Sequence, residues 1–185
     1  ARAEAGISKN DLPGFPVPIF DSGSYILTSN LNVPKDTSGI NIATYNVTLD
    51  LNGFTISGNG GTSGSGVNSV LQSVTYNRIT VKNGVVCNMG EHGICVGEQS
   101  SVTTIHFYGN GGIGIDAGSR SRVIGNTAKD NVGYGFKLGP SGLDKGISGY
   151  TDNLLTGNNG GGSAEQVLDG VKIGTNLCQG NKFCP

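Results

Sequence analysis

Residues 114–118, Gly-Ile-Asp-Ala-Gly, form one copy of a five-residue motif that occurs six times in the 185-residue chain. Each copy reads glycine, an apolar residue, a variable residue, a small or apolar residue, and a last residue that is usually small. The copies begin 27, 27, 21, 21 and 35 residues apart, at Gly39, Gly66, Gly93, Gly114, Gly135 and Gly170. A repeat of this length predicts a fold built from stacked, similar turns of chain.

Apolar residues alternate with other residues inside the motif, and this is the period of a β-strand. The second and fourth positions are therefore predicted to point inward, and the third position is predicted to point to solvent. The third positions form a mostly polar column, at Asn41, Asn68, Cys95, Asp116, Lys137 and Lys172. The polarity of this column supports the predicted register.

A second group of apolar residues follows each motif and predicts a second strand in each turn. Its inward residues are predicted at Val47, Leu49, Leu51, Ile79, Val81, Val102, Val123 and Ile147. Asn-rich corners usually come next, at Asn52-Gly53, Asn83-Gly84, Asn110-Gly111, Asn131 and Asn158-Asn159. Asn and Gly tolerate the left-handed backbone conformation of a sharp corner. A stacked Asn is also able to hydrogen-bond to the turn above or below.

These features predict an all-β fold, a parallel β-solenoid of about six coils that forms a single domain over residues 1–185. The domain comprises an N-terminal cap and first coil at 1–33, repeat coils at 34–174 and a C-terminal cap at 175–185. The apolar, proline-rich residues 12–20 are predicted to cover one end without extending the sheet. Insertion loops, where function often resides, are predicted near residues 58–66, 140–146 and 160–169.

Composition argues against several classes of partner. The chain has 33 Gly, no Trp, 14% charged residues, a net charge of -1 and no basic stripe, so nucleic acid is not an expected partner. No apolar run approaches the roughly 20 residues that span a bilayer. Residues 1–5 contain no apolar signal-peptide core, so the protein is either cytosolic or has lost its signal peptide.

The four cysteines occur as two close pairs, Cys87 with Cys95 and Cys178 with Cys184. Two local disulfides are the preferred interpretation, although four cysteines allow three connectivities and free thiols are the alternative. Their spacing is too wide for a zinc site, and no metal site is predicted. Disulfides favour an oxidising compartment.

Several segments, taken together, resemble secreted bacterial right-handed parallel β-helix proteins of the pectin-lyase-like superfamily. They are residues 13–19, 22–27, 47–56 and 79–84 together with the Gly-Ile-rich motifs. The resemblance implies a single-stranded, right-handed β-helix in an extracellular or periplasmic location. Characterised relatives include polysaccharide lyases, glycoside hydrolases, uronan epimerases and phage adhesins, which implies a protein that binds or processes polysaccharide. No catalytic motif of these relatives maps onto this sequence, and a non-catalytic structural or adhesion module is the alternative.

Two glycine-rich patterns resemble cofactor motifs. Residues 109–114 satisfy G-x-G-x-x-G, but a dinucleotide site needs a strand before the motif and a long helix after it. Residues 111–116 resemble the start of a calcium-binding nonapeptide, which builds a site only in tandem copies. We therefore predict no cofactor at either pattern, while calcium elsewhere on the surface remains an alternative that the resemblance implies.

The outward column is the best candidate for chemistry, because stacked turns bring outward side chains of successive turns to about 5 Å. The candidate catalytic residues are Asp116, Lys137 and Arg120, which together offer a base and cations for a uronate carboxylate. The candidate substrate-binding residues are Lys172, Arg122 and Tyr108. The simpler interpretation of the column is a solvated ladder with an exposed salt bridge. His92 and His106 are interpreted as loop and surface residues.

Overall fold

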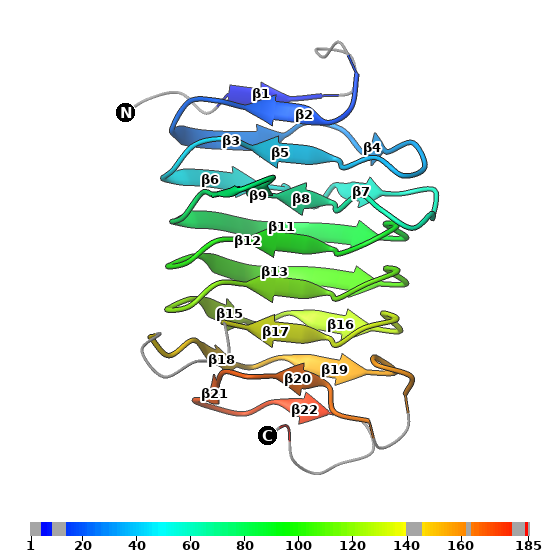
Figure 1. The fold of residues 1–185 in the computed structure, drawn as a ribbon, viewed down its shortest axis with the longest axis vertical. Coiled ribbons are helices and arrows are strands. Elements are labelled where there is room, and N and C mark those ends of the chain that lie inside the picture. The colour runs from blue at the N-terminus through cyan, green and yellow to red at the C-terminus, as the bar shows by residue number, and fades with distance from the viewer. Residues whose placement is uncertain (1–4, 9–13, 140–145, 162–163, 179–183, 185) are drawn as a thin grey trace.

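The computed structural model describes residues 5–8, 14–139, 146–161, 164–178 and 184, and these residues form a parallel β-solenoid of about seven turns without a helix. Within this part of the chain, one sheet has seven strands and a second sheet has thirteen. Figure 1 shows the two sheets face to face, with the chain descending one strand spacing per turn. The predicted all-β solenoid is confirmed.

The seven-stranded sheet contains the repeated motif. Its strands are β2 (Val17–Ile19), β5 (Ile40–Ile42), β8 (Val67–Asn68), β12 (Ile94–Val96), β14 (Ile115–Ala117), β17 (Phe136–Leu138) and β20 (Val167–Leu168). The strands pair in parallel and in register, so that Ile94, Ile115 and Phe136 stack in one fully buried column. The motif therefore defines two inward columns and one outward column in the middle strands of the sheet.

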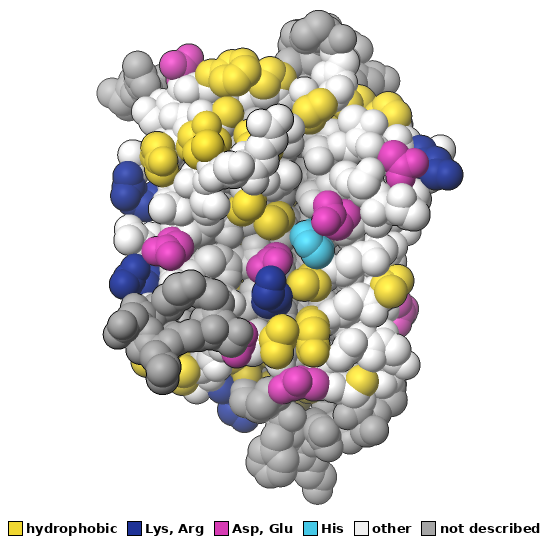
Figure 2. All heavy atoms as spheres, in the orientation of Figure 1, with side chains coloured by type: hydrophobic (Ala, Val, Ile, Leu, Met, Phe, Trp, Pro, Cys, Tyr) yellow, Lys and Arg dark blue, Asp and Glu magenta, His cyan; other side chains and the backbone are white. Residues whose placement is uncertain are grey.

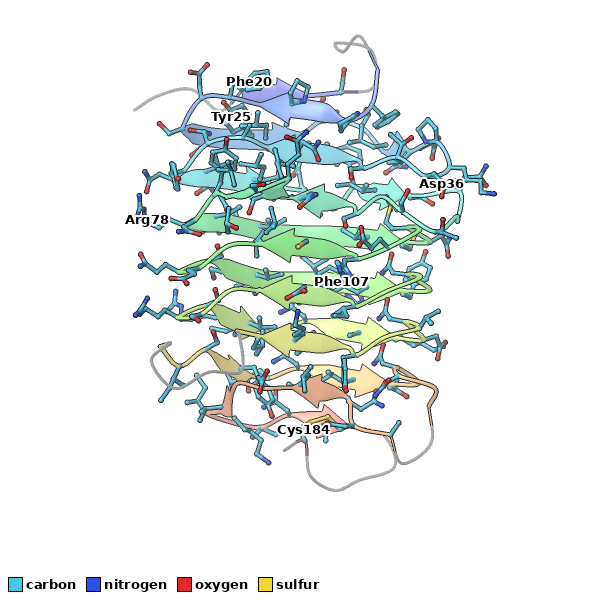
Figure 3. All side chains as sticks on the ribbon, in the orientation of Figure 1. Phe20, Tyr25, Asp36, Arg78, Phe107 and Cys184 are labelled. Carbon is cyan, nitrogen blue, oxygen red and sulfur yellow. A yellow bond between two sulfur atoms is a disulfide. The ribbon has the colours of Figure 1, made fainter. Side chains whose placement is uncertain are left out.

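The thirteen-stranded sheet forms the other side of each turn and bends along its length. One half contains β1 (Ala5–Ile7), β3 (Gly23–Leu27), β6 (Val47–Asp50), β15 (Arg122–Ile124), β18 (Gly149–Thr151) and β21 (Val171–Lys172). The other half contains β4 (Leu31–Asn32), β7 (Thr55–Ser57), β16 (Thr127–Lys129), β19 (Leu154–Thr156) and β22 (Leu177–Cys178). The long strands β11 (Ile79–Cys87) and β13 (Ser101–Tyr108) run through both halves. Phe107 of β13 is fully buried in the space between the sheets (Figure 3).

A short antiparallel hairpin is inserted after β8. It consists of β9 (Val70–Leu71) and β10 (Val74–Thr75). The hairpin was not predicted, and it accounts for part of the longer spacing between the motifs that begin at Gly66 and Gly93.

The motif glycines are explained by close approach between turns. A Cβ atom added to Gly93 would lie 2.5 Å from the carbonyl oxygen of Gly114, and one added to Gly114 would lie 2.5 Å from that of Gly135. Neither glycine has a positive φ. The glycines are thus required because a side chain would collide with the backbone of the next turn.

Polar side chains form three ladders at the corners of the turns. The ladders are Asn110–Asn131–Asn158, Asn126–Asn153–Asn176 and Ser100–Ser121–Ser148. In each ladder the side-chain oxygen accepts a hydrogen bond from the backbone N–H of the equivalent residue one turn earlier. Asn52 and Asn83 do not belong to these ladders. Both are exposed, and their φ angles of 50° and 58° are in the left-handed region of a sharp corner. Both predicted roles of asparagine therefore occur, at different corners.

The prediction for the last copy of the motif is wrong, because this copy lies in the thirteen-stranded sheet and not in the seven-stranded sheet. Val171 and Lys172 pair with Gly149 and Tyr150 in the thirteen-stranded sheet, and β20 takes the expected place beside β17. Gln166 occupies the position of the motif glycine, because its carbonyl accepts the N–H of Phe136 as the carbonyl of Gly135 accepts the N–H of Ile115. Similarly, Tyr150 is fully buried in the position predicted for Ile147, which is 74% exposed.

The N-terminal segment also differs from its prediction. Residues 17–19 form β2 and extend the seven-stranded sheet by pairing with β5, so the solenoid has about seven turns rather than six. Within the predicted caps, residues 1–4, 9–13, 179–183 and 185 lie outside the described residues, as do residues 140–145 of the predicted loop.

Candidate functional site

A hollow of about 290 Å³ lies on the outer face of the seven-stranded sheet, beside the β9–β10 hairpin. We call it the outer hollow. Its lining residues are Val70, Thr75, Cys95, Val96, Gly97, Glu98, Asp116, Ala117, Gly118, Ser119, Lys137 and Gly139. Figure 2 shows acidic, basic and histidine side chains gathered near the centre of this face. The outer hollow therefore combines a small apolar floor with charged groups.

Asp116 and Lys137 form an ion pair in the outer hollow. They occupy the outward middle positions of β14 and β17 and are direct neighbours in the register. Asp116 Oδ2 lies 3.0 Å from Lys137 Nζ, and their side chains are 21% and 37% exposed. Each charge is thus already partly neutralised by the other, as expected for opposite charges on adjacent parallel strands.

Glu98 and Arg120 form a second ion pair at the edge of the outer hollow. Arg120 Nη1 donates to Glu98 Oε2 at 3.2 Å. Arg120 lies at a corner with a positive φ of 60°, where its backbone N–H donates to Gly146 O. Of the three candidate catalytic residues, the structure thus pairs Asp116 with Lys137 and places Arg120 against a different carboxylate.

Cys95 lies directly beside Asp116 in the outward column. Burial raises the pKa of the Cys95 thiol to about 12, and the negative charges of Asp116 and Glu91 add to this effect. The thiol is therefore protonated at neutral pH, and a thiolate is the form that acts as a nucleophile. Cys95 contributes a small, nearly apolar surface to the outer hollow.

Ser119, like Glu98, lines the outer hollow and was missed by sequence reasoning. It is 1% exposed, and its Oγ has no hydrogen-bond partner among the residues that the structure describes. A buried polar group without a partner is unusual in a folded protein. The sequence contains no signal for it, because Ser119 neighbours the serine ladder without belonging to it.

The candidate binding residues lie on other faces of the solenoid. Lys172 belongs to β21, where its Nζ donates to Cys184 O at 3.4 Å, and Leu168 takes its predicted place below Lys137. Arg122 is exposed on β15. Tyr108 is 43% exposed and lines a separate hollow of about 340 Å³ with His106 and Lys129. The six candidate residues therefore do not form one site.

His92 has a structural role in a turn. Its Nδ1 accepts the backbone N–H of Ile113 at 3.0 Å, and its Nε2 lies 3.8 Å from Glu91 Oε1. Accepting this hydrogen bond requires an unprotonated Nδ1, so the neutral ring carries its proton on Nε2. Histidine here joins two successive turns, in keeping with its interpretation as a loop residue.

The predicted Cys87–Cys95 disulfide is absent, whereas the Cys178–Cys184 disulfide is present (Figure 3). Cys87 lies at the end of β11 in the thirteen-stranded sheet, and Cys95 lies in β12 of the other sheet. Their side chains occupy outward columns of two different sheets, which keeps the sulfur atoms apart. Proximity in sequence was a poor guide because a corner separates the two residues.

No group of three or more His, Cys, Asp or Glu side chains suited to a metal ion occurs in the described part of the chain. Nor does any helix in the described ranges have the length and apolar character needed to cross a membrane. Comparison of the chain with protein-family models, curated proteins and solved structures gives no match.

Proposed function

We propose that this protein binds polysaccharide in the outer hollow and acts as an adhesion module. The observation that carries the proposal is the joint presence, in one hollow, of ion-paired side chains and of Ser119, whose hydroxyl has no hydrogen-bond partner among the described residues. A volume of about 290 Å³ suits one or two sugar rings, near the lower end of small-molecule sites. Polar groups of this kind provide hydrogen bonds for sugar hydroxyls.

A lyase or epimerase is the second candidate. Such chemistry needs a cation to neutralise the uronate carboxylate and a free base to remove the neighbouring proton. Lys137 is bonded to Asp116, and Arg120 is bonded to Glu98. The candidate base Asp116 is therefore held by a cation instead of being free to remove a proton, which favours binding over catalysis.

We also propose that the protein is a secreted, right-handed β-helix of the pectin-lyase-like type. The parallel solenoid with one motif per turn supports this assignment at the level of fold, which does not determine function. The Cys178–Cys184 disulfide supports an oxidising compartment such as the cell exterior or periplasm.

Affinity electrophoresis in gels containing neutral, uronic or amino polysaccharides tests the proposal. We expect at least one polymer to retard the protein, and the double variant D116A/K137A to lose this retardation. The matched control is D50A/K82A, which removes a second 3.0 Å ion pair from the thirteen-stranded sheet. Equal retardation of both variants would place binding outside the outer hollow.

The same panel separates binding from catalysis. A lyase creates an unsaturated sugar with a new ultraviolet absorbance, and we expect no such absorbance from uronic polymers with or without calcium. Absorbance that appears with the native protein and disappears with D116A would establish the lyase candidate instead.

A further inference from the structure

A second hollow, of about 340 Å³, lies on the outer face of the thirteen-stranded sheet. We call it the Tyr108 hollow, and its lining residues include His106, Tyr108, Thr127, Lys129 and Asp130. They belong to β13, to β16 of the next turn and to the corner after β16. The outer hollow lies on the other sheet, and the two sheets face each other across the core (Figure 1). The two hollows therefore open on different faces of the solenoid.

The side chain of Tyr108 is held against the outer face of the sheet. Tyr108 and Cys87 are direct neighbours in the register of β13 and β11. A side-chain hydrogen bond with Cys87 raises the pKa of the Tyr108 hydroxyl, so this hydroxyl lies against the thiol of the preceding turn. Cys87 is only 2% exposed although its position faces outward, which is consistent with cover by the tyrosine. A ring that is held at its tip loses little further freedom when a ligand binds.

The ring of Tyr108 is also available to a ligand. The residue is 43% exposed, and in the described part of the chain no aromatic or cationic side chain stacks on its ring. Tyr45 differs, because its ring centroid lies 5.3 Å from that of Tyr76 and Arg78 lies 5.7 Å above it. A free aromatic face is an apolar surface with negative charge density, which attracts the weakly positive C–H groups of a ligand.

Polar groups lie beside the ring, toward the next turn. Lys129 is the neighbour of Tyr108 in the register, and its Nζ lies 3.5 Å from Asp130 Oδ2. Both charged side chains are 59% exposed. An ammonium has three donors and a carboxylate has about four acceptor positions, so this ion pair keeps donors and acceptors for a ligand. His106 and Thr127, which are also neighbours in the register, add further hydrogen-bonding groups.

This combination matches the two chemical surfaces of a sugar ring. All hydroxyls of a β-glucose unit are equatorial, so each face of its ring presents only axial C–H groups. Such a face stacks on an aromatic ring, while the hydroxyls at the rim of the sugar reach polar side chains.

We infer that the Tyr108 hollow is a second glycan site, which binds neutral pyranose chains of the β-glucose type by stacking on Tyr108. The inference goes beyond the proposed function and does not depend on binding at the outer hollow. Two sites on different faces allow one molecule to hold two glycan chains at once, which suits an adhesion module.

Nuclear magnetic resonance titration of the isotope-labelled protein tests the inference. The probes are a tetramer of β-1,4-linked glucose and a tetramer of fructofuranose units, whose five-membered rings lack an extended face of C–H groups. We expect the glucose tetramer to shift the amide signals of residues 106–109 and 127–130, with a dissociation constant on the order of 1 mM. The fructose tetramer should bind at least about fivefold more weakly. In affinity gels with polymer well below 1 mM, a site this weak adds little retardation, so the outer hollow is tested separately.

Two substitutions of Tyr108 and two controls sharpen the test. Tyr108→Leu keeps an apolar cover over Cys87 but removes the aromatic face, so the glucose tetramer should bind about fivefold more weakly. Tyr108→Phe keeps the ring and should bind within about twofold of the native protein. Tyr45→Leu is the matched control, since Tyr45 is 41% exposed but already has partners on its ring. Tyr45→Leu and D116A/K137A should both leave the dissociation constant unchanged.

Four outcomes would overturn the inference. Equal effects of Tyr108→Leu and Tyr45→Leu would show that the Tyr108 ring is not the platform. Loss of the glucose tetramer from D116A/K137A would place the ligand in the outer hollow. Equal affinity for the two tetramers would exclude stacking on a pyranose face. Failure of the glucose tetramer to bind at all would overturn this inference and leave the proposal for the outer hollow intact, because affinity electrophoresis tests that proposal independently.

Discussion

Asn110 donates two hydrogen bonds to the side-chain oxygen of Asn131, one turn further along the solenoid. The backbone N–H contributes one at 3.2 Å and the side-chain Nδ2 contributes the other at 2.8 Å. Asn131 repeats both contacts with Asn158, and Asn158 repeats them with Gln166. All four residues are buried. The corner is therefore held by a continuous chain of side-chain amides in place of apolar packing.

Asn131→Ala is expected to destabilise the protein by about 3 kcal/mol. The change leaves the buried N–H of Asn110 without an acceptor, and it leaves the Nδ2 of Asn110 with only Val86 O at 3.4 Å. A buried group without a partner costs about 1–3 kcal/mol. Urea denaturation followed by circular dichroism measures the effect. The exposed Asn59 is the control, and Asn59→Ala should change stability by less than about 0.5 kcal/mol. Equal effects of the two substitutions would show that the ladder adds nothing specific.

Gly114→Ala is expected to destabilise the protein by about 3 kcal/mol or to prevent folding. The added methyl group would lie 2.5 Å from the backbone oxygen of Gly135, and backbone in a stacked turn moves only at the expense of its neighbours. Gly160 serves as the comparison, since it has open space but a φ of 81°. Gly160→Ala should cost only about 1–2 kcal/mol. Similar losses at both sites would argue against close approach as the reason for the motif glycine.

Alkylation without reductant should label two of the four cysteines after denaturation, because Cys178 and Cys184 are bonded and Cys87 and Cys95 are free. In the folded protein at pH 8 we expect Cys95 to react far more slowly than an exposed thiol. Burial has raised its pKa to about 12, so very little thiolate is present. Mass spectrometry gives both results. Four labelled cysteines, or none, would contradict the observed disulfide pattern.

The Asp50 carboxylate should make stability depend on acid pH. Burial acts to raise the pKa of Asp50, but hydrogen bonds from Asn52, Lys82 and Asn83 outweigh it and lower the pKa below its ordinary value of 3.8. A lowered pKa in the folded state means that the stabilisation is present above pH 3.8 and is lost as the pH falls through the folded value. Asp50→Asn should flatten the decline of the melting temperature below about pH 4. If the melting temperature of Asp50→Asn declined with acid pH as that of the native protein does, Asp50 would contribute nothing to the decline.

Ser119→Ala should raise stability by about 1 kcal/mol while lowering affinity for glycans. The buried hydroxyl of Ser119 has no partner in the part of the chain that the structure describes, so its removal relieves the cost of its desolvation. A purely structural serine would show the opposite sign of stability change. Thermal unfolding of the free protein, measured beside the affinity electrophoresis, distinguishes the two roles.

Most of the fold was predictable because the motif follows from two physical requirements, one steric and one of polarity. Glycine is needed where turns approach closely, and the alternation of residues defines the inner and outer columns. The rule gave a wrong prediction at Gly170. The sequence that follows it matches the motif, but Val171 and Lys172 lie in the thirteen-stranded sheet. Gln166 replaces the expected glycine, and its side chain ends the asparagine ladder. A change of this kind breaks the sequence pattern while preserving the hydrogen bonds.

The candidate site was only partly predictable. Asp116 and Lys137 lie in the outward column, and the register alone predicts their contact. Arg120 lies at a corner, where side-chain direction depends on local φ and ψ, so its partner Glu98 was not predicted. Ser119 stands out because none of the described residues around it forms a hydrogen bond with its hydroxyl. The spacing of residues in the sequence does not predict this.

The spacing of 21 residues between Ile94 and Ile115 has a consequence for engineering. Residues 94–114 form one complete turn whose two surfaces match at Ser100 and Asn110. The side-chain oxygens of both residues accept backbone N–H groups of the preceding turn, and their own N–H groups donate to Ser121 and Asn131 of the next turn. A gene in which this segment is duplicated should encode a solenoid one turn taller, with an additional copy of the same interface. The turn is thus an interchangeable building block, and its height of roughly 4.8 Å offers a molecular ruler for spacing groups displayed on the surface.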